Sequence, residues 1–335
     1  MKHIAIVGAT GAVGRELLTL LAERAFPAAS CRLFASARSA GQQLPGPTGP
    51  LTVEELGPDA FAGVDIALFS AGGAISRQFA PIAQAAGTLV IDNSSAFRLV
   101  AGVPLVIPEI NGHTARQHHG LIANPNCSAI ILTMALWPLH QLCSIRRIVV
   151  ATYQAVSGAG ARALAELETQ TRAVLAGEPA APSVFPVPCA FNVFSHNTPI
   201  AEDGYNIEER KVIAETRHIL GAPDLAIAPT CMRVPVRRAH TEAVSIEFTA
   251  PVTEDQARAA LNAAAGVTVV DDRDNNRFPT PLDASGRDDV LVGRIRRDPS
   301  VADGRGLQLV CCGDQLRKGA ALNALQIAEL LMTGE

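Results

Sequence analysis

A glycine-rich turn separates the first apolar run of this chain from its first helical pattern. The apolar run covers residues 3–7 (HIAIV), and the turn covers residues 8–14 (GATGAVG). Glycines in this context let backbone N–H groups approach a pyrophosphate at the start of a helix, where the helix dipole favours anions. The spacing is GxxGxxG rather than GxGxxG, so the prediction depends mainly on the position of this turn directly after a strand. The turn predicts a dinucleotide site.

Short apolar runs alternate with helical patterns through the first third of the chain. The predicted strands are 3–7, 31–35, 64–69 and 88–91, and the predicted helices are 14–24 and 74–86. This β–α alternation predicts a Rossmann-like, doubly wound parallel sheet. The stretch 40–50, dense in Gly and Pro, is expected to be a surface loop.

The pattern changes after residue 127. Residues 147–153 and 242–248 alternate like strands with one covered face, and helices are expected at 160–176 and 207–220. We therefore predict a dinucleotide-binding domain at residues 1–127 and an α+β domain at residues 128–317. A last helix, at 318–335, is expected to pack back onto the first domain.

Composition narrows the possible classes of protein. The chain has 335 residues, enough for two cores, and its net charge of −4 with 4% aromatic residues argues against nucleic-acid binding. The seven cysteines include no CxxC pair, which suits a reducing compartment. No secretory leader pattern, apolar stretch of membrane length or metal-ligand spacing is evident. We expect a cytoplasmic protein with no metal site and no membrane partner.

The second predicted strand discriminates between cofactors. An NAD enzyme usually places a carboxylate near its end to hold the ribose hydroxyl, whereas residues 35–39 read ASARS. Arg38, with Ser36 and Ser39, fits a 2′-phosphate and favours NADP; the alternative is a solvated arginine. Residues 70–73 (SAGG) are expected to cap the next helix and line the same cleft.

Cys127 is the candidate nucleophile. In residues 122–131 (IANPNCSAII) it lies where an apolar strand ends and an apolar helix begins. The positive end of the helix dipole favours a thiolate there. A lone cysteine is more often a buried structural residue, but the rest of the chain favours the nucleophile.

A nucleophilic cysteine needs a proton-transfer partner and a grip on its substrate. One strand is predicted to carry Arg233 and to end at His240, which suits a carboxylate ligand and acid–base chemistry, respectively. Gln154, at another strand end, is placed to hold an acyl oxygen, and Ser157 and Gly158 to admit a nicotinamide closely.

Two charged motifs each fit either a binding site or a solvated surface. Glu208 and Lys211 share one helical face, and the charged composition of that segment is more typical of a solvated surface. Arg98, in the hydroxyl-rich stretch 92–98, binds a phosphate or faces water.

Seven motifs in this order resemble the aspartate-β-semialdehyde dehydrogenase family along essentially the whole chain: GATGAVG, DNSSAFR, NPNCS, TYQAVSGAG, EERK, RVPVRRAH and GDQLRKGAALNALQIAE. The resemblance implies reduction of L-aspartyl-4-phosphate to L-aspartate-4-semialdehyde by NADPH, with release of phosphate. That step leads towards lysine, diaminopimelate, threonine and methionine. The resemblance also implies a glyceraldehyde-phosphate-dehydrogenase-like architecture and a homodimer formed through the second domain's sheet, with a tetramer left open.

The resemblance further implies a role for each matching residue. Cys127 would form a thioacyl enzyme, with His240 as the acid–base residue and Gln154 orienting the acyl group. The substrate-binding residues would be Arg233 for the α-carboxylate, Glu208 for the amino group, and Arg98, Lys211 and Asn126 for the phosphate. The cofactor-binding residues would be Gly8, Thr10, Gly11, Ala12, Val13, Ser36, Arg38, Ser39, Ser70, Ala71, Gly72, Ser157, Gly158 and Gln315. Gln315 stands where the family commonly has Asn.

Two other functions stay open at this point. The same scaffold could reduce another acyl phosphate, such as N-acetylglutamyl phosphate; Glu208 argues against it, because an acetylated amine carries no positive charge. A catalytically retired paralogue that only binds NADP is the second, and the presence of both Cys127 and His240 argues against that.

Overall fold

The computed structural model describes residues 1–332, and contacts between Cα atoms divide the chain into two compact units. The first unit consists of residues 1–126 together with the described residues from 319 onward. The second unit consists of residues 127–318, so that Cys127 is its first residue.

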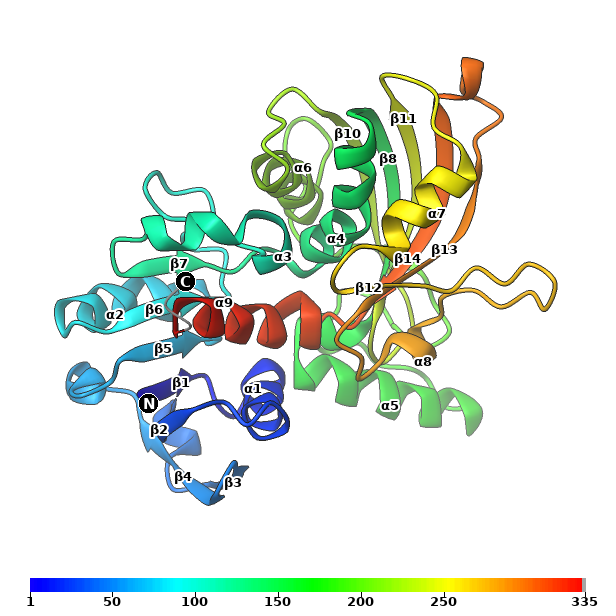
Figure 1. Cartoon of the computed structure of the whole chain (residues 1–335). Coiled ribbons are helices and arrows are strands. Elements are labelled where there is room, and N and C mark those ends of the chain that lie inside the picture. The colour runs from blue at the N-terminus through cyan, green and yellow to red at the C-terminus, as the bar shows by residue number, and fades with distance from the viewer. Residues whose placement is uncertain (333–335) are drawn as a thin grey trace. The chain divides into compact units, whose positions relative to one another are not determined.

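A seven-stranded sheet forms the centre of the first unit (Figure 1). Its order is β3-β4-β2-β1-β5-β6-β7, and every neighbouring pair is parallel except β3 and β4. Without β3, this is the strand order of dinucleotide-binding sheets, whose winding reverses between β1 and β5. The strands are β1 Lys2–Val7, β2 Ala28–Ala35, β3 Gln43–Gly46, β4 Gly49–Glu55, β5 Ile66–Phe69, β6 Leu89–Asp92 and β7 Leu121–Ala123. The predicted doubly wound sheet is confirmed.

Helices pack against both faces of this sheet. They are α1 Ala12–Glu23, α2 Gly73–Ala85, α3 Pro108–Asn111 and α9 Leu322–Met332. In β1, Ile4 and Ile6 belong to one buried cluster, whereas Ala5 and Val7 belong to another. A strand covered on both faces reads as a continuous apolar run, which is why the sequence predicted it.

The last helix belongs to the core of the first unit. Leu322 and Leu325 of α9 are buried in the same cluster as Ile4 and Ile6. A π-helical segment, Arg317–Ala321, precedes α9, so the helix predicted at 318–335 is not a uniform α-helix. Its residues 333–335 lie outside the described part of the chain.

The surface loop predicted at 40–50 is wrong, because β3 and β4 form an antiparallel hairpin there. Leu44 pairs with Leu51, and Leu44 and Val53 are buried. Glycine and proline obscured this alternation in the sequence. Proline is tolerated because β3 is an edge strand, where some backbone groups need no ladder partner.

The second unit contains another seven-stranded sheet, in the order β12-β13-β14-β11-β8-β10-β9. Only β8 with β10 and β12 with β13 are parallel pairs. The strands are β8 Ile145–Gln154, β9 Phe194–Ser195, β10 Ala226–Arg233, β11 His240–Phe248, β12 Val267–Val269, β13 Val290–Arg297 and β14 Gly306–Gly313. The helices are α4 Cys127–Leu142, α5 Ala161–Leu175, α6 Ile207–Ile219, α7 Glu254–Asn262 and α8 Pro281–Ala284. The predicted α+β class is confirmed.

One face of this sheet is covered and the other is partly open. The helix α4 packs on β8, β11, β13 and β14 and contacts α6 and α7 (Figure 1). Alternate residues of β11 are buried, beginning with His240 and Glu242. On β8, Val149 and Tyr153 point the other way and are 38% and 41% exposed. The second face therefore presents apolar surface.

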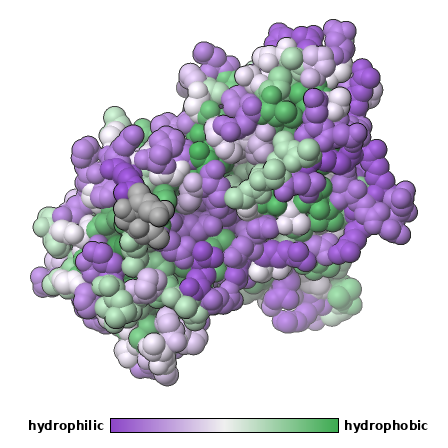
Figure 2. All heavy atoms as spheres, in the orientation of Figure 1, coloured by the Kyte–Doolittle hydropathy of each residue, from purple (hydrophilic) through white to green (hydrophobic). Residues whose placement is uncertain are grey.

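Polar residues cover most of the molecular face drawn in Figure 2, where apolar residues form separate patches. Within residues 1–332, no helix combines the length and apolar character needed to cross a membrane.

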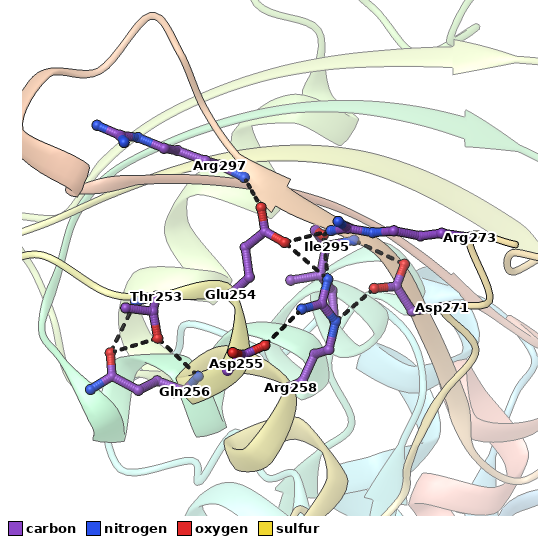
Figure 3. Close-up of polar contacts among 9 residues, drawn as sticks. All are labelled: Thr253, Glu254, Asp255, Gln256, Arg258, Asp271, Arg273, Ile295 and Arg297. Atoms are coloured by element: carbon purple, nitrogen blue, oxygen red, sulfur yellow. Dashed lines mark hydrogen bonds and ion pairs between the residues drawn. The ribbon is translucent and has the colours of Figure 1, made fainter.

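An ion-pair network joins α7 to β13 and to residues 271–273, which follow β12 (Figure 3). Arg258 Nε donates to Asp271 Oδ2 at 2.9 Å, and its Nη2 donates to Glu254 Oε2 at 3.1 Å. The side chain of Asp271 is only 3% exposed. Arg273 also donates to Glu254. This network anchors the helix at the edge of the sheet.

Replacing Arg258 with Met is expected to lower the free energy of unfolding by about 2–4 kcal/mol, because it leaves the buried Asp271 carboxylate without its cation. Asp255 pairs with the same arginine but is 98% exposed, so Asp255→Asn is the control and should change stability by less than about 0.5 kcal/mol. Urea denaturation measures both. Equal changes in the free energy of unfolding for the two variants would show that the buried Arg258–Asp271 pair stabilises the protein no more than the exposed Arg258–Asp255 pair does.

Candidate active site

Cys127 is the first residue of α4, as predicted, and follows β7 by a three-residue connection. The helix is buried on almost every side, including Ser128, Ala129 and Ile130. Its N-terminus is therefore held by the core of the second unit, while Cys127 itself stays partly exposed. A reactive thiol needs this combination of fixed position and access.

His240 lies beside this thiol. Its Nε2 is 3.6 Å from Cys127 Sγ, and the backbone N–H of Ala155 donates to its Nδ1 at 3.0 Å. Complete burial, and then the positive charge of Arg233, lower the pKa of His240 to about 3. The ring is therefore neutral near pH 7. Because Nδ1 accepts a hydrogen bond, the ring proton resides on Nε2, which faces the sulfur.

Arg233 and His240 belong to two strands, so the prediction of one strand carrying both is wrong. β10 ends at Arg233, residues 234–239 turn back, and β11 begins at His240. β10 runs parallel to β8 with Arg233 opposite Gln154, and β11 runs antiparallel to β8. All three side chains consequently lie at the same end of the sheet.

The residue before His240 has an unusual backbone. Ala239 is buried with φ of 72°, a conformation that costs energy for a residue with a Cβ. Its N–H donates to Gln315 Oε1 at 2.7 Å, and Gln315 Nε2 donates to Ser157 Oγ. Gln315 thus holds the turn that leads into His240.

The absence of a side chain at Gly158 leaves space beside the His240 ring and the Arg233 guanidinium. A Cβ at this position would lie 3.2 Å from His240 Cε1 and 3.4 Å from Arg233 Nη1. Gly158 is exposed. A small residue therefore keeps both groups open to a ligand from this side.

Arg233 is a buried cation whose acceptors are neutral. It is 2% exposed, and its Nη1 and Nη2 donate to Ala155 O and His196 Nε2, each at 2.8 Å. Within residues 1–332, its Nε has no hydrogen-bond partner. Burial lowers the pKa of the Arg233 guanidinium, although the Glu208 carboxylate opposes this shift. An anionic ligand bound here would offset the cost of burying this charge.

Glu208 is only 5% exposed, so its interpretation as a solvated surface residue is wrong. Lys211 Nζ pairs with Glu208 Oε2 at 3.3 Å. Gln154 Nε2 donates to Ser128 Oγ at 2.9 Å and to Glu208 Oε1 at 3.4 Å. A carboxylate, an ammonium and an amide are thus grouped within the second unit.

In the first unit, the glycine turn directly follows β1, at the point where the winding of the sheet reverses between β1 and β5. A Cβ at Gly8 would lie 2.5 Å from Ser70 O, and one at Gly14 would collide with the backbone of Gly8 and Ala9. The N-cap of α1 is Gly11, so no side chain caps this helix, and the first turn of α1 contains no acidic residue. Thr10, Ala12 and Val13 are partly exposed there. This helix start suits a pyrophosphate.

Arg38 lies on a short 3-10 turn, Ala37–Ser39, directly after β2. Ser36 and Arg38 are exposed, and Ser39 is partly exposed. After β5, Ser70 and Ala71 are partly exposed and Gly72 is exposed. The donor set at the end of β2 fits the 2′-phosphate of NADP.

Arg98 and Asn126 belong to the first unit. Arg98 is 9% exposed, which excludes the interpretation that it simply faces water. Its Nε donates to Asn124 O at 2.9 Å and its Nη2 to Asn93 O at 2.7 Å. Asn126, 5% exposed, directly precedes Cys127 in the chain.

His196 was missed by sequence reasoning, although it contacts Arg233. It lies in an irregular, Pro-rich stretch, 37 residues from its partner, so no local spacing points to it. The strained Ala239 was missed for the same reason. Ser128 was expected to lie beside the Cys127 sulfur, but its hydrogen bond from Gln154 was not foreseen.

Comparisons with known proteins agree with this arrangement. A family model described as "semialdehyde dehydrogenase, NAD binding domain" matches residues 3–118, and one described as "semialdehyde dehydrogenase, dimerisation domain" matches residues 136–318. The aspartate-semialdehyde dehydrogenase of Synechocystis sp. is 53% identical over 98% of this chain and 97% of its own length. That of Bacillus subtilis is 45% identical over 98% and 97%, respectively.

A solved structure gives the same result. Aspartate semialdehyde dehydrogenase II from Vibrio cholerae, crystallised with ASA, is 42% identical with a TM-score of 0.96, over 99% of this chain and 98% of that one. We conclude that the chain belongs to the aspartate-semialdehyde dehydrogenase family.

Proposed function

We propose that Cys127 is the nucleophile and His240 its hydrogen-bonding partner in this family's reaction. As a family member, the chain is an NADP-dependent oxidoreductase that interconverts L-aspartyl-4-phosphate and L-aspartate-4-semialdehyde, with phosphate as the other product. The observation that carries the proposal is the distance of 3.6 Å between Cys127 Sγ and the protonated nitrogen of a neutral, buried imidazole.

The first step is acyl transfer to Cys127. The thiolate forms a bond to the acyl carbon, the bond from that carbon to the phosphate oxygen breaks, and phosphate leaves with the electron pair. Gln154 lies at the same end of the sheet and is proposed to orient the acyl oxygen. When bound, NADPH would supply a hydride to the thioester carbon. Breaking the carbon–sulfur bond would then release the aldehyde and restore the Cys127 thiolate.

His240 is proposed to act chiefly as a donor. Taking a proton would make both ring nitrogens donors and set Nδ1–H against the N–H of Ala155, which the geometry disfavours. The Nε2–H can stabilise the thiolate and the negative oxygen that forms during reduction. The thiolate route needs no proton from this ring, so the donor half of the predicted acid–base role is favoured.

Charged side chains are proposed to bind the two ends of the substrate. Arg233 would take the α-carboxylate and Glu208 the α-ammonium. The phosphate would be bound by Arg98, Lys211 and Asn126. The cofactor would be bound at the glycine turn and by Arg38, with Ser157 and Gly158 admitting the nicotinamide. Gln315 would contribute to the site by holding the turn at Ala239, which precedes His240.

We infer that two copies pair through the partly open face of the second unit's sheet, to which Val149 and Tyr153 contribute. The match to a dimerisation domain supports this pairing. All seven cysteines are free, so a reducing compartment such as the cytoplasm is proposed, where Cys127 would stay reduced.

The reverse reaction provides the test. With aspartate semialdehyde, NADP and phosphate, absorbance of the reduced cofactor should increase, and the increase should depend on phosphate. N-acetylglutamate semialdehyde should react far more slowly. A preference for the acetylated substrate would identify the other acyl-phosphate reductase, and NADP binding without turnover would identify a retired paralogue.

Arg38→Ala should raise the Michaelis constant for NADPH by about 10- to 100-fold while leaving that for NADH nearly unchanged, because only NADPH carries the 2′-phosphate. Arg77, which is exposed on α2, gives a control, since Arg77→Ala should change neither constant by more than about twofold. Equal effects of Arg38→Ala on the two cofactors would make Arg38 a solvated surface residue.

A further inference from the structure

A chain of hydrogen bonds joins Arg233 to the backbone of Glu208. Arg233 Nη2 lies 2.8 Å from His196 Nε2, and His196 Nδ1 lies 3.3 Å from Thr198 Oγ1. Thr198 Oγ1 also accepts from the backbone N–H of Glu208 at 3.2 Å. These contacts connect the residues proposed to bind the α-carboxylate and the α-ammonium.

The direction of each hydrogen bond is fixed. A guanidinium can only donate, so His196 Nε2 accepts from Arg233 and the ring proton lies on Nδ1. Nδ1–H therefore donates to Thr198. Burial lowers the pKa of His196 to about 4; Glu208 opposes this shift, whereas Arg233 and Lys211 reinforce it. The ring is neutral near pH 7, as an acceptor of the Arg233 bond must be.

Both ends of this chain of bonds are anchored in regular structure. β9 pairs with β10 beside Arg233, and the backbone N–H of His196 donates to Cys231 O at 2.9 Å. At the other end, Thr198 Oγ1 accepts from the first turn of α6, which a capping box at Asn206 also fixes. The hydrogen-bonded pair His196–Thr198, called the bridge below, therefore connects the end of β10 to the start of α6.

The bridge also preserves the charge of the site. His196 Nε2 and Ala155 O accept hydrogen bonds from the Arg233 guanidinium, but as neutral groups they leave its positive charge in place. A carboxylate in place of His196 would pair with Arg233 and compete with a ligand. A neutral acceptor orients the cation and leaves its attraction for an anionic ligand intact.

We propose that His196 and Thr198 are positioning residues that set the spacing between the Arg233 guanidinium and the Glu208 carboxylate. They thereby select a substrate that carries its ammonium and its carboxylate on one carbon. This inference rests on the proposed function, because it takes the ligand to be aspartate semialdehyde or its acyl phosphate.

The first test uses two substitutions of His196 in the phosphate-dependent assay. His196→Leu removes the acceptor and should raise KM for aspartate semialdehyde by about 10- to 100-fold, with kcat within about threefold and KM for phosphate and NADP unchanged. His196→Gln keeps an acceptor oxygen near the Nε2 position and should restore most of the affinity. Equal KM values for Leu and Gln, or a wild-type KM in His196→Leu, would overturn the proposal.

The second test uses Thr198 and a substrate without the amino group, 4-oxobutanoate. Thr198→Val should reduce the preference for aspartate semialdehyde over 4-oxobutanoate by about 10-fold, whereas Thr198→Ser should keep it. An unchanged preference in Thr198→Val would overturn the role of the bridge in selection. A wild-type enzyme that does not oxidise aspartate semialdehyde would instead overturn the proposed function, so the two failures are distinguishable.

Discussion

Replacing Cys127 with Ala is expected to lower the phosphate-dependent oxidation of aspartate semialdehyde by about 10⁴-fold or more, because no other group can carry the acyl intermediate. The Kd for NADPH should stay within about twofold of wild type, since the glycine turn and Arg38 are untouched. Steady-state kinetics and fluorescence titration of NADPH measure the two quantities.

Cys143 supplies the matched control for this variant. It is also a partly exposed free thiol, and it contacts Thr249 and Ala250 rather than any proposed site residue. Cys143→Ala should keep full activity. Substantial turnover by Cys127→Ala would remove the thioacyl mechanism.

His240 gives the second large effect and separates two roles for this residue. His240→Leu removes the donor to the sulfur and should lower kcat by about 10²- to 10³-fold. His240→Gln keeps an amide N–H near the Nε2 position and, if His240 acts as a donor, should retain activity within about 30-fold of wild type. Equal losses in both variants would restore the role of general base.

The same residue predicts how stability depends on pH. The pKa of His240 is about 3 in the folded chain and about 6.5 in an unfolded one. The unfolded state therefore binds more protons between these values, and the free energy of unfolding falls as the pH is lowered through this window. From pH 7 to pH 5 the loss attributable to His240 is about 2 kcal/mol.

Urea denaturation at pH 7 and pH 5 checks this sign and size. His240→Gln should lose about 2 kcal/mol less than wild type between the two values. His196, whose pKa is about 4, remains in both proteins and contributes a similar loss to each. An identical pH dependence in the two proteins would mean that the pKa of His240 is the same in the folded and unfolded chains.

The sequence predicted best those features that depend on short segments. The strand at 3–7, its glycine turn and the next helix follow from a local pattern, although α1 begins at Ala12 rather than at residue 14. Cys127 was placed correctly at the start of α4 because the apolar runs on either side define the junction. The hairpin at 43–55 was missed because glycine and proline concealed the pairing of Leu44 with Leu51.

The features that the sequence could not supply depend on contacts between distant segments. The burial of Glu208 arises because α6 packs on β10 and α4, so a charged composition alone suggested a solvated face. His196 meets Arg233 only because β9 pairs with β10. The strain at Ala239 depends on Gln315, 76 residues further along the chain. Periodicity carries no signal for any of these.

The most direct measurement is mass spectrometry of the wild-type protein after incubation with aspartate semialdehyde and NADP in the absence of phosphate. Without phosphate to accept the acyl group, the peptide that contains Cys127 should gain the mass of one aspartyl group, and hydroxylamine should release it. A protein that turns over aspartate semialdehyde with phosphate, yet forms no adduct or carries it on another residue, would contradict the account.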